Sequence, residues 1–201
     1  MELYDYEKKH IELLRKAACE CMVLLKSDGT FPLEKACEVA LYGSGARKTI
    51  KGGTGSGDVN VRHYVTIEEG LKNAGFQITT SDWMDEYEVK YKDARKLFVK
   101  EIKQDADKKG MPAFLLGMGA VMPEPEYELP IQKDGDLAIY VLSRISGEGS
   151  DRKPIAGDLK LTRTEVRDIL YLNEHFQKFM LVLNVGGIVD LSPVNHVKNI
   201  L

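Results

Sequence analysis

Two nearly continuous apolar runs place the strongest constraint on what this chain can fold into. They are Leu137–Leu142 and Phe179–Val185. A strand in which polar residues do not alternate with apolar ones must be buried on both faces. Such strands are typical of a parallel sheet covered by helices on both sides. Segments with helical spacing precede and separate these runs. The sequence therefore predicts an α/β fold, a three-layer α/β/α sandwich with a mostly parallel sheet.

Further elements are predicted before and between the two runs. Shorter β-prone segments are expected at 38–42 and 76–80, and a long charged helix at 83–109. Helical spacing also predicts an amphipathic helix near the N-terminus, with its apolar stripe formed by Ile11, Leu14, Ala18, Met22 and Leu25.

Two capping boxes mark the starts of shorter helices. Thr66 is followed three residues later by Glu69, and Thr162 by Glu165. In this spacing the threonine hydroxyl and the glutamate carboxylate satisfy backbone amides at a helix N-terminus. We expect helices after both threonines.

The simplest domain division is a single partial domain over residues 1–201. The last residues, 196–201, resemble the start of another helix or strand. A sheet ending there would have an uncovered edge. We therefore expect a sandwich that is incomplete at its C-terminal end, from a chain that has been cut short.

Composition excludes several classes of protein. The net charge of −3 gives no general attraction to nucleic acid or to an anionic membrane, and no apolar run is long enough to span a bilayer. The N-terminus lacks a secretory signal, which predicts a cytoplasmic protein. Cys19, Cys21 and Cys37 do not have metal-ligand spacing, so we expect neither a metal nor a cofactor.

The loop from Gly43 to His63 follows the first predicted strand and is rich in glycine. In parallel sheets, ligands bind beyond the carboxyl ends of the strands. Thr54, Ser56 and Asp58 carry groups that can hydrogen-bond sugar hydroxyls or a phosphate. A flexible loop without a ligand explains the glycines almost as well.

A phosphate site is the main alternative for the start of this loop. The segment from Gly43 to Thr49 follows a strand and ends in lysine and threonine. A P-loop requires glycine before its lysine, and Arg47 occupies that position. The dinucleotide-binding pattern fails too, because Lys48 stands where its third glycine should be. Nucleotide binding is therefore only weakly supported.

The loop from Ser143 to Lys153 follows the most apolar run and contains Glu148 between two glycines. Flanking glycines leave a carboxyl accessible and give the loop freedom to move it, which suits a proton donor. The alternative is an ordinary loop glutamate paired with Arg144 or Arg152.

Several motifs, in order along nearly the whole chain, resemble the C-terminal sandwich domain of family 3 glycoside hydrolases. This family includes β-glucosidases, β-xylosidases and N-acetylglucosaminidases. The matching segments are Val23–Leu33, Gly52–Val59, Ser146–Arg152 and Val182–Gly187 followed by Asp190–Ser192.

The resemblance implies specific roles. Glu148 corresponds to the general acid/base, Ser56 to a sugar contact, and Thr54 and Asp58 to weaker sugar contacts. The reaction would be retaining hydrolysis of a β-linked oligosaccharide or β-glucoside.

The family's nucleophile is an aspartate on a separate barrel domain, which these residues do not contain. The chain alone should then be inactive. Met1 stands just ahead of the sandwich, which resembles members with reversed domain order.

Ser81-Asp82-Trp83 resembles the family's nucleophile motif, but its position argues against that role. The triplet opens the long charged helix, where serine or aspartate caps the N-terminus. We expect Asp82 to be structural.

Two other classes of function stay open at this point. One is a carbohydrate-binding or interaction module without catalysis. The other is a phosphate- or nucleotide-binding domain that uses the residues from Gly43 to Lys51.

Overall fold

The computed structural model describes residues 3–54, 57, 59–118, 120–132, 135–146 and 151–201. Four parallel strands form its sheet, in the order β2-β1-β3-β4. They are β1 (Glu38–Tyr42), β2 (Gln77–Ile78), β3 (Leu137–Arg144) and β4 (Lys178–Val185). Every residue of β3 is buried. The expected α/β fold with a parallel sheet is confirmed.

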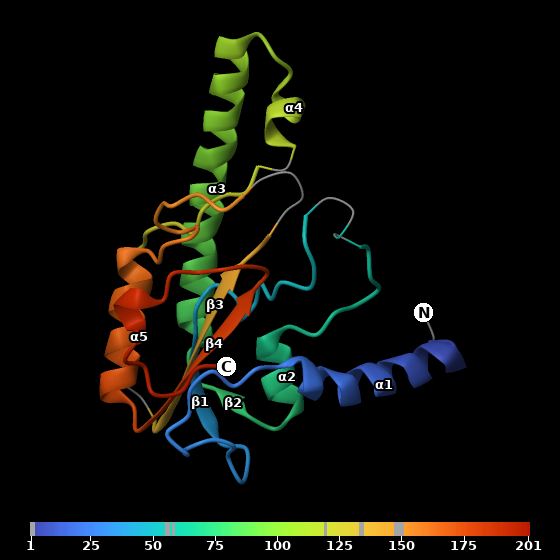
Figure 1. Ribbon diagram of the computed structural model, residues 1–201, viewed down its shortest axis with the longest axis vertical. Helices are drawn as coiled ribbons and strands as arrows, with labels where there is room; N and C mark the ends of the chain where they lie inside the picture. Colours follow the sequence, from blue (N-terminus) through green and yellow to red (C-terminus); the bar gives the residue numbers. More distant parts are fainter. Residues whose placement is uncertain (1–2, 55–56, 58, 119, 133–134, 147–150) are drawn as a thin grey trace.

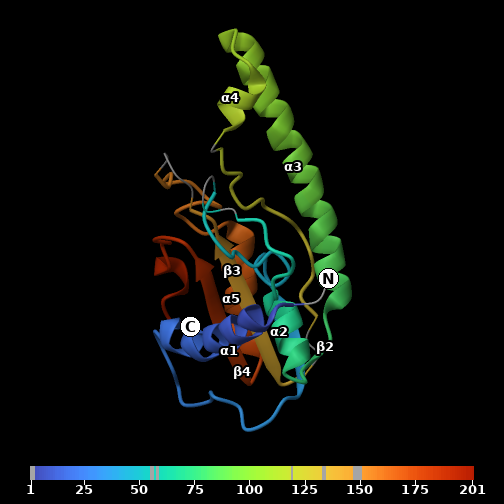
Figure 2. The ribbon, with the colours of Figure 1, turned by 90° about the vertical axis from the view of Figure 1, so that its right-hand side faces the viewer.

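Helices lie on both sides of this sheet. They are α1 (Asp5–Cys21), α2 (Ile67–Asn73), α3 (Ser81–Lys109), α4 (Ala113–Gly117) and α5 (Arg163–His175), with a 3₁₀ turn η2 at Ser192–Val194. In Figure 2, α1 and α2 lie in front of the sheet and α5 lies behind it. Crossovers between parallel strands are right-handed. The crossover from β1 to β2, which contains α2, runs in one direction across the sheet, and the crossover from β3 to β4, which contains α5, runs in the opposite direction, so the two helices lie on opposite faces.

The core on the α3 and α5 side is aromatic. Tyr42 and Tyr140 are paired residues on β1 and β3, so they point to the same face. The Tyr42 ring meets Trp83 of α3 edge-on, with centroids 5.1 Å apart. The Tyr140 hydroxyl lies 3.3 Å from that of Tyr127, which in turn donates to Asp168 of α5. These contacts join both helices to the centre of the sheet.

Both predicted helix starts are confirmed, with one difference. Thr66 and Thr162 accept hydrogen bonds from the backbone amides of Glu69 and Glu165. The Glu165 side chain completes its capping box, whereas that of Glu69 lies 2.9 Å from His63 instead.

The N-terminal helix is shorter than its periodicity predicts, and its stripe is not buried. α1 ends at Cys21, and none of its described residues is buried. Leu25 and Lys26 are extended, since Leu25 N donates to Ile200 O over 2.8 Å and Ile200 N to Lys26 O over 3.0 Å. Strand pairing at this point overrides the helical period.

The last residues of the chain lie beside β4 and form isolated bridges there. Leu181 N donates to Asn199 O over 3.0 Å, and Leu201 N donates to Leu181 O over 2.9 Å. The final residues therefore continue the sheet beyond β4, and Lys26 pairs antiparallel with Ile200 outside them.

The long helix α3 extends well past the sheet, with α4 beside its far half (Figure 1). It begins at Ser81 and is preceded by Thr80. Ser81 and Asp82 therefore stand in the first turn, and neither is the N-cap that the sequence suggested. The Thr80 hydroxyl makes no helix cap either, because it bonds both the amide and the carbonyl of Leu41. Asp82 is exposed in this turn, and its structural role stays a prediction.

Candidate functional site

A cavity of about 330 Å³ lies where β1 and β3 end. The chain leaves these adjacent strands in opposite directions, which makes this edge the topological switch point of the sheet. Ligands of open α/β sheets bind in such a crevice. The walls come from the loops after both strands and from the segment before β3. Among the lining residues are Ser44, Lys48, Gly52, Glu124, Arg144, Arg152 and Asp158.

The two glycine-containing loops predicted from the sequence meet at this edge. Thr54 N, in the loop after β1, donates to Ser146 O, in the loop after β3, over 3.2 Å. Thr54 is half-buried. Ser56, Asp58 and Glu148 lie outside the described residues. The backbone contact therefore joins the loops that carry the predicted sugar contacts and the predicted acid/base.

Asn184 near the end of β4 ties the same loops to the sheet. Its Nδ2 donates to Ile50 O over 3.1 Å, and its Oδ1 accepts from the Ser143 hydroxyl over 3.0 Å. Beyond it, the chain approaches Ser146 so closely that a Cβ on Gly186 would lie 3.0 Å from the Ser146 Oγ. A side chain at this position would require Ser146 to move by a few tenths of an ångström. The sequence showed Asn184 only as part of a motif and gave no sign of this cross-link.

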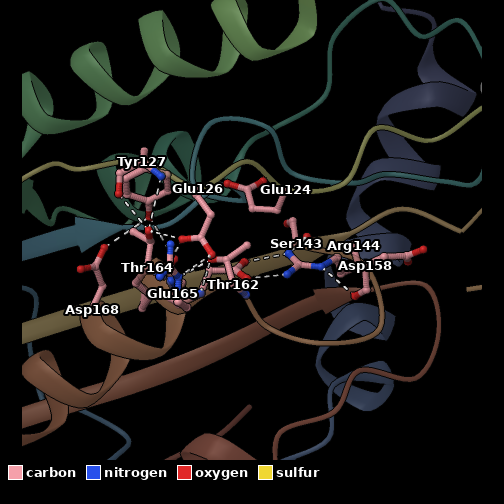
Figure 3. Close-up of polar contacts among 12 residues, drawn as sticks. Glu124, Glu126, Tyr127, Ser143, Arg144, Asp158, Thr162, Thr164, Glu165 and Asp168 are labelled. Atoms are coloured by element: carbon pink, nitrogen blue, oxygen red, sulfur yellow. Dashed lines mark hydrogen bonds and ion pairs between the residues drawn. The ribbon is translucent and has the colours of Figure 1, made fainter. Parts of the chain in front are cut away.

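A buried ion pair anchors the start of the Ser143–Lys153 loop. Arg144 donates to both carboxylate oxygens of Glu165, over 2.8 and 2.6 Å, and to the carbonyls of Asp158 and Ser143. Figure 3 shows the guanidinium of Arg144 between Glu165 and Asp158. This buried, bidentate ion pair holds the end of β3 against the start of α5.

A second pair anchors the far side of that loop. Arg152 Nη1 donates to Asp158 Oδ1 over 3.0 Å, and Lys153 N donates to Asp158 Oδ2 over 2.8 Å. Arg144 and Arg152 were the partners considered for a purely structural Glu148. Among the described residues Arg144 pairs with Glu165 and Arg152 with Asp158, and the role of Glu148 stays a prediction.

Glu124 is a site residue that the sequence did not indicate. It lies in the extended segment between α4 and β3, where its backbone amide donates to Gly157 O over 2.8 Å. Tyr87 Oη of α3 donates to its carboxyl over 2.6 Å. Burial raises the pKa of Glu124 to about 8, and the negative charge of Glu165 adds to this effect. Glu124 is therefore protonated at neutral pH.

The raised pKa of Glu124 predicts that stability is lost as the pH rises from about 4.5 to about 8. Folded Glu124 holds its proton up to about pH 8, whereas the unfolded side chain loses it near 4.5. Between these values the folded state binds more protons, so the free energy of unfolding falls as the pH rises. We expect this fall to be smaller in E124Q, measured by urea denaturation at about pH 5.5 and about pH 9.

Two comparisons make the Glu124 experiment specific. Asp168, whose pKa burial raises to about 6, is present in both proteins, so its contribution cancels. E128Q, at an exposed position on the same segment, should keep the wild-type profile. Parallel profiles for E124Q and the wild type would contradict the assignment.

No metal centre or membrane span is found in the part of the chain that the structure describes. Its His, Cys, Asp and Glu side chains form no group of three or more that could hold an ion. None of its helices combines the length and apolarity needed to cross a bilayer.

Comparisons with known proteins match nearly the whole chain. The profile of the Glycosyl hydrolase family 3 C-terminal domain matches residues 22–201. Beta-glucosidase A of Butyrivibrio fibrisolvens is 34% identical over 212 residues, which cover 92% of this chain and 24% of that protein. A beta-glucosidase of Ruminococcus albus is 31% identical over 92% of this chain and 19% of its own length. The chain thus spans about a quarter or less of these relatives.

Solved structures agree with the sequence comparisons. Beta-glucosidase 3B from Thermotoga neapolitana in complex with glucose superposes with a TM-score of 0.69 and 32% identity, over 98% of this chain and 27% of that one. A beta-glucosidase from Paenibacillus barengoltzii gives a TM-score of 0.66 and 25% identity, over 94% of this chain and 20% of its own.

Proposed function

This chain belongs to the glycosyl hydrolase family 3 C-terminal domain family, and from that membership we propose that it is one domain of a retaining β-glucosidase. Its part in the reaction is to supply the general acid/base and one wall of the sugar subsite. The observation that carries the proposal is the hydrogen bond from Thr54 N to Ser146 O, which unites the two loops to which these roles are assigned. The names of the relatives support a β-glucoside as substrate.

Glu148 acts twice in this mechanism. In the first step its carboxyl protonates the glycosidic oxygen while a carboxylate nucleophile attacks the anomeric carbon, so the aglycone leaves as an alcohol and a covalent glycosyl-enzyme forms. In the second step the Glu148 carboxylate removes a proton from water, which attacks the same carbon and frees the nucleophile. The anomeric configuration is retained because it is inverted twice.

The nucleophile must come from outside these residues. Retaining enzymes hold their two carboxyl groups about 5 Å apart. We assign the nucleophile to an aspartate on a barrel domain that lies against this edge of the sheet. Ser56 contacts a sugar hydroxyl, and Thr54 and Asp58 complete the wall. The switch-point location of the loops supports this arrangement.

Purified residues 1–201 are therefore expected to give no hydrolysis of an aryl β-glucoside above the uncatalysed rate. A preparation that also contains the barrel should turn over. D82N provides the matched control, because Asp82 resembles a nucleophile by its neighbours but is exposed in the first turn of α3. Activity of residues 1–201 that D82N abolishes would contradict the proposal. Saturable glucose binding without turnover in the complete protein would favour a binding module.

A further inference from the structure

A second cavity, of about 550 Å³, lies beside the switch-point cavity, between the site loops and the hairpin formed by α3 and α4. This hairpin groove shares four wall residues with the switch-point cavity, namely Tyr91, Val121, Met122 and Ile145. The two cavities are therefore neighbours. The hairpin and the site loops lie at the same end of the sheet, toward which the strands point (Figure 1).

One face of α3 supplies most of the apolar surface of the hairpin groove. The apolar residues on this face are Tyr91, Phe98, Val99 and Ile102. Their helical spacing places them on one side of α3. α4 adds Phe114 to the lining and packs closely at the far end, where a Cβ on Gly117 would lie 3.8 Å from the Ile102 side chain. The other end of the face, at Tyr91, reaches the wall shared with the switch-point cavity.

The hairpin groove holds apolar surface that the described chain does not bury. Phe114 is 67% exposed and Val99 is 41% exposed, although both line the groove. Contiguous exposed apolar surface of this kind marks a binding site. The side chains are therefore accessible to a ligand.

The lining favours an aromatic ligand over a second sugar. Apart from the Tyr91 hydroxyl, its polar side chains are those of Thr54, Arg95 and Lys103. A sugar brings several hydroxyl groups, each of which needs a hydrogen-bond partner when it leaves water. An aromatic ring needs no such partners, and it is attracted both to the Phe114 ring and to the cationic groups.

The predicted acid/base loop lies where the two cavities meet. Glu148 is assigned to protonate the oxygen between the sugar and its leaving group, so its loop should border both the sugar and the aglycone. Ile145, three residues before Glu148, lines both cavities. Thr54, whose amide binds the Ser146 carbonyl of the same loop, lines the hairpin groove.

We propose that the hairpin groove is the aglycone subsite and that it selects β-glucosides with an aromatic aglycone. This inference rests on the proposed hydrolysis and adds the substrate class. The sugar occupies the polar switch-point cavity, and the aglycone ring lies against Phe98 and Phe114. A volume of about 550 Å³ is within the range of small-ligand sites and has room for a two-ring aglycone.

The test compares 2-naphthyl β-glucoside with methyl β-glucoside as substrates of the complete protein. We expect F114A to lower the ratio of their kcat/KM values, naphthyl over methyl, by about three- to tenfold, because a ring contact is lost. V99S should lower the same ratio by making the wall more polar. The controls L115A and V89S change exposed residues of the same two helices outside the groove lining and should keep the wild-type ratio. Thermal melts show that each variant is folded.

Calorimetric titration of residues 1–201 with 2-naphthol measures the hairpin groove without hydrolysis. We expect saturable binding that F114A weakens by a similar factor and that L115A leaves unchanged. V99S, compared with V89S, gives an independent result should F114A fail to fold.

Two results would overturn the aglycone subsite. One is equal behaviour of F114A and L115A in both measurements. The other is an equal loss of kcat/KM for the two glucosides in F114A, which would mean that the hairpin supports the fold or another domain. A complete protein that hydrolyses neither glucoside would refute the proposed function instead, and the naphthol titration would then decide alone whether the groove takes an aromatic ring.

Discussion

E148Q in the complete protein is expected to lower kcat for alkyl β-glucosides by about 100- to 10,000-fold. Glutamine cannot donate the proton that an alkoxide leaving group requires. The loss should shrink for nitrophenyl glucosides, whose leaving groups depart without protonation. The measurement is kcat/KM against the pKa of the leaving group, which should show a steep dependence only in the variant. The control is E34Q, which makes the same exchange at an exposed glutamate. Glu34 precedes the N-terminal end of β1, whereas the site loops follow the C-terminal ends of the strands.

A uniform loss for all leaving groups would contradict the assignment. It would mean that Glu148 supports the fold or binds substrate without transferring a proton. An unchanged rate for alkyl glucosides would exclude Glu148 from the reaction altogether.

R144M is expected to destabilise the chain by about 3–5 kcal/mol. The side chains of Arg144 and Glu165 are only 4% and 1% exposed, so the substitution leaves a buried carboxylate without its partner. The carbonyls of Ser143 and Asp158 lose a donor as well. Urea denaturation at neutral pH gives the free energy of unfolding. K16M removes an exposed pair with Glu12 and should have no measurable effect.

The double variant R144M/E165M separates the causes of that loss. Two apolar side chains can replace a buried ion pair at little cost, so most of the stability should return. Part of the loss should remain, because Glu165 also accepts from Thr162 N in the helix cap and the carbonyls of Ser143 and Asp158 still lack the Arg144 donor. A double variant as unstable as R144M would show that the effect comes from packing and not from an unpaired charge.

The elements that the sequence predicted well are those with local causes. The apolar runs of β3 and β4 and the threonine caps of α2 and α5 depend on neighbouring residues, and the structure contains all four. The end of α1 could not be predicted, because Leu25 and Lys26 are held extended by Ile200, far along the chain. Periodicity carries no information about such a partner.

The same limit explains what was missed at the site. Glu124 lies in a segment without periodicity, and Gly157 and Tyr87 determine its position. Arg144 was considered a partner for Glu148, but sequence alone cannot rank the acids that could reach it. Glu165 was predicted only as a cap, although the same carboxylate also forms the buried ion pair. The contacts of Glu124 and of Glu165 with Arg144 join residues that are distant in the sequence.

The most direct test of the central claim is the product formed by E148A in the complete protein when azide is added. Azide needs no general base, so it should attack the glycosyl-enzyme, restore turnover of an activated aryl β-glucoside and give the β-glucosyl azide with retained configuration. No rescue would contradict Glu148 as the acid/base. An α-glucosyl azide would instead identify Glu148 as the nucleophile.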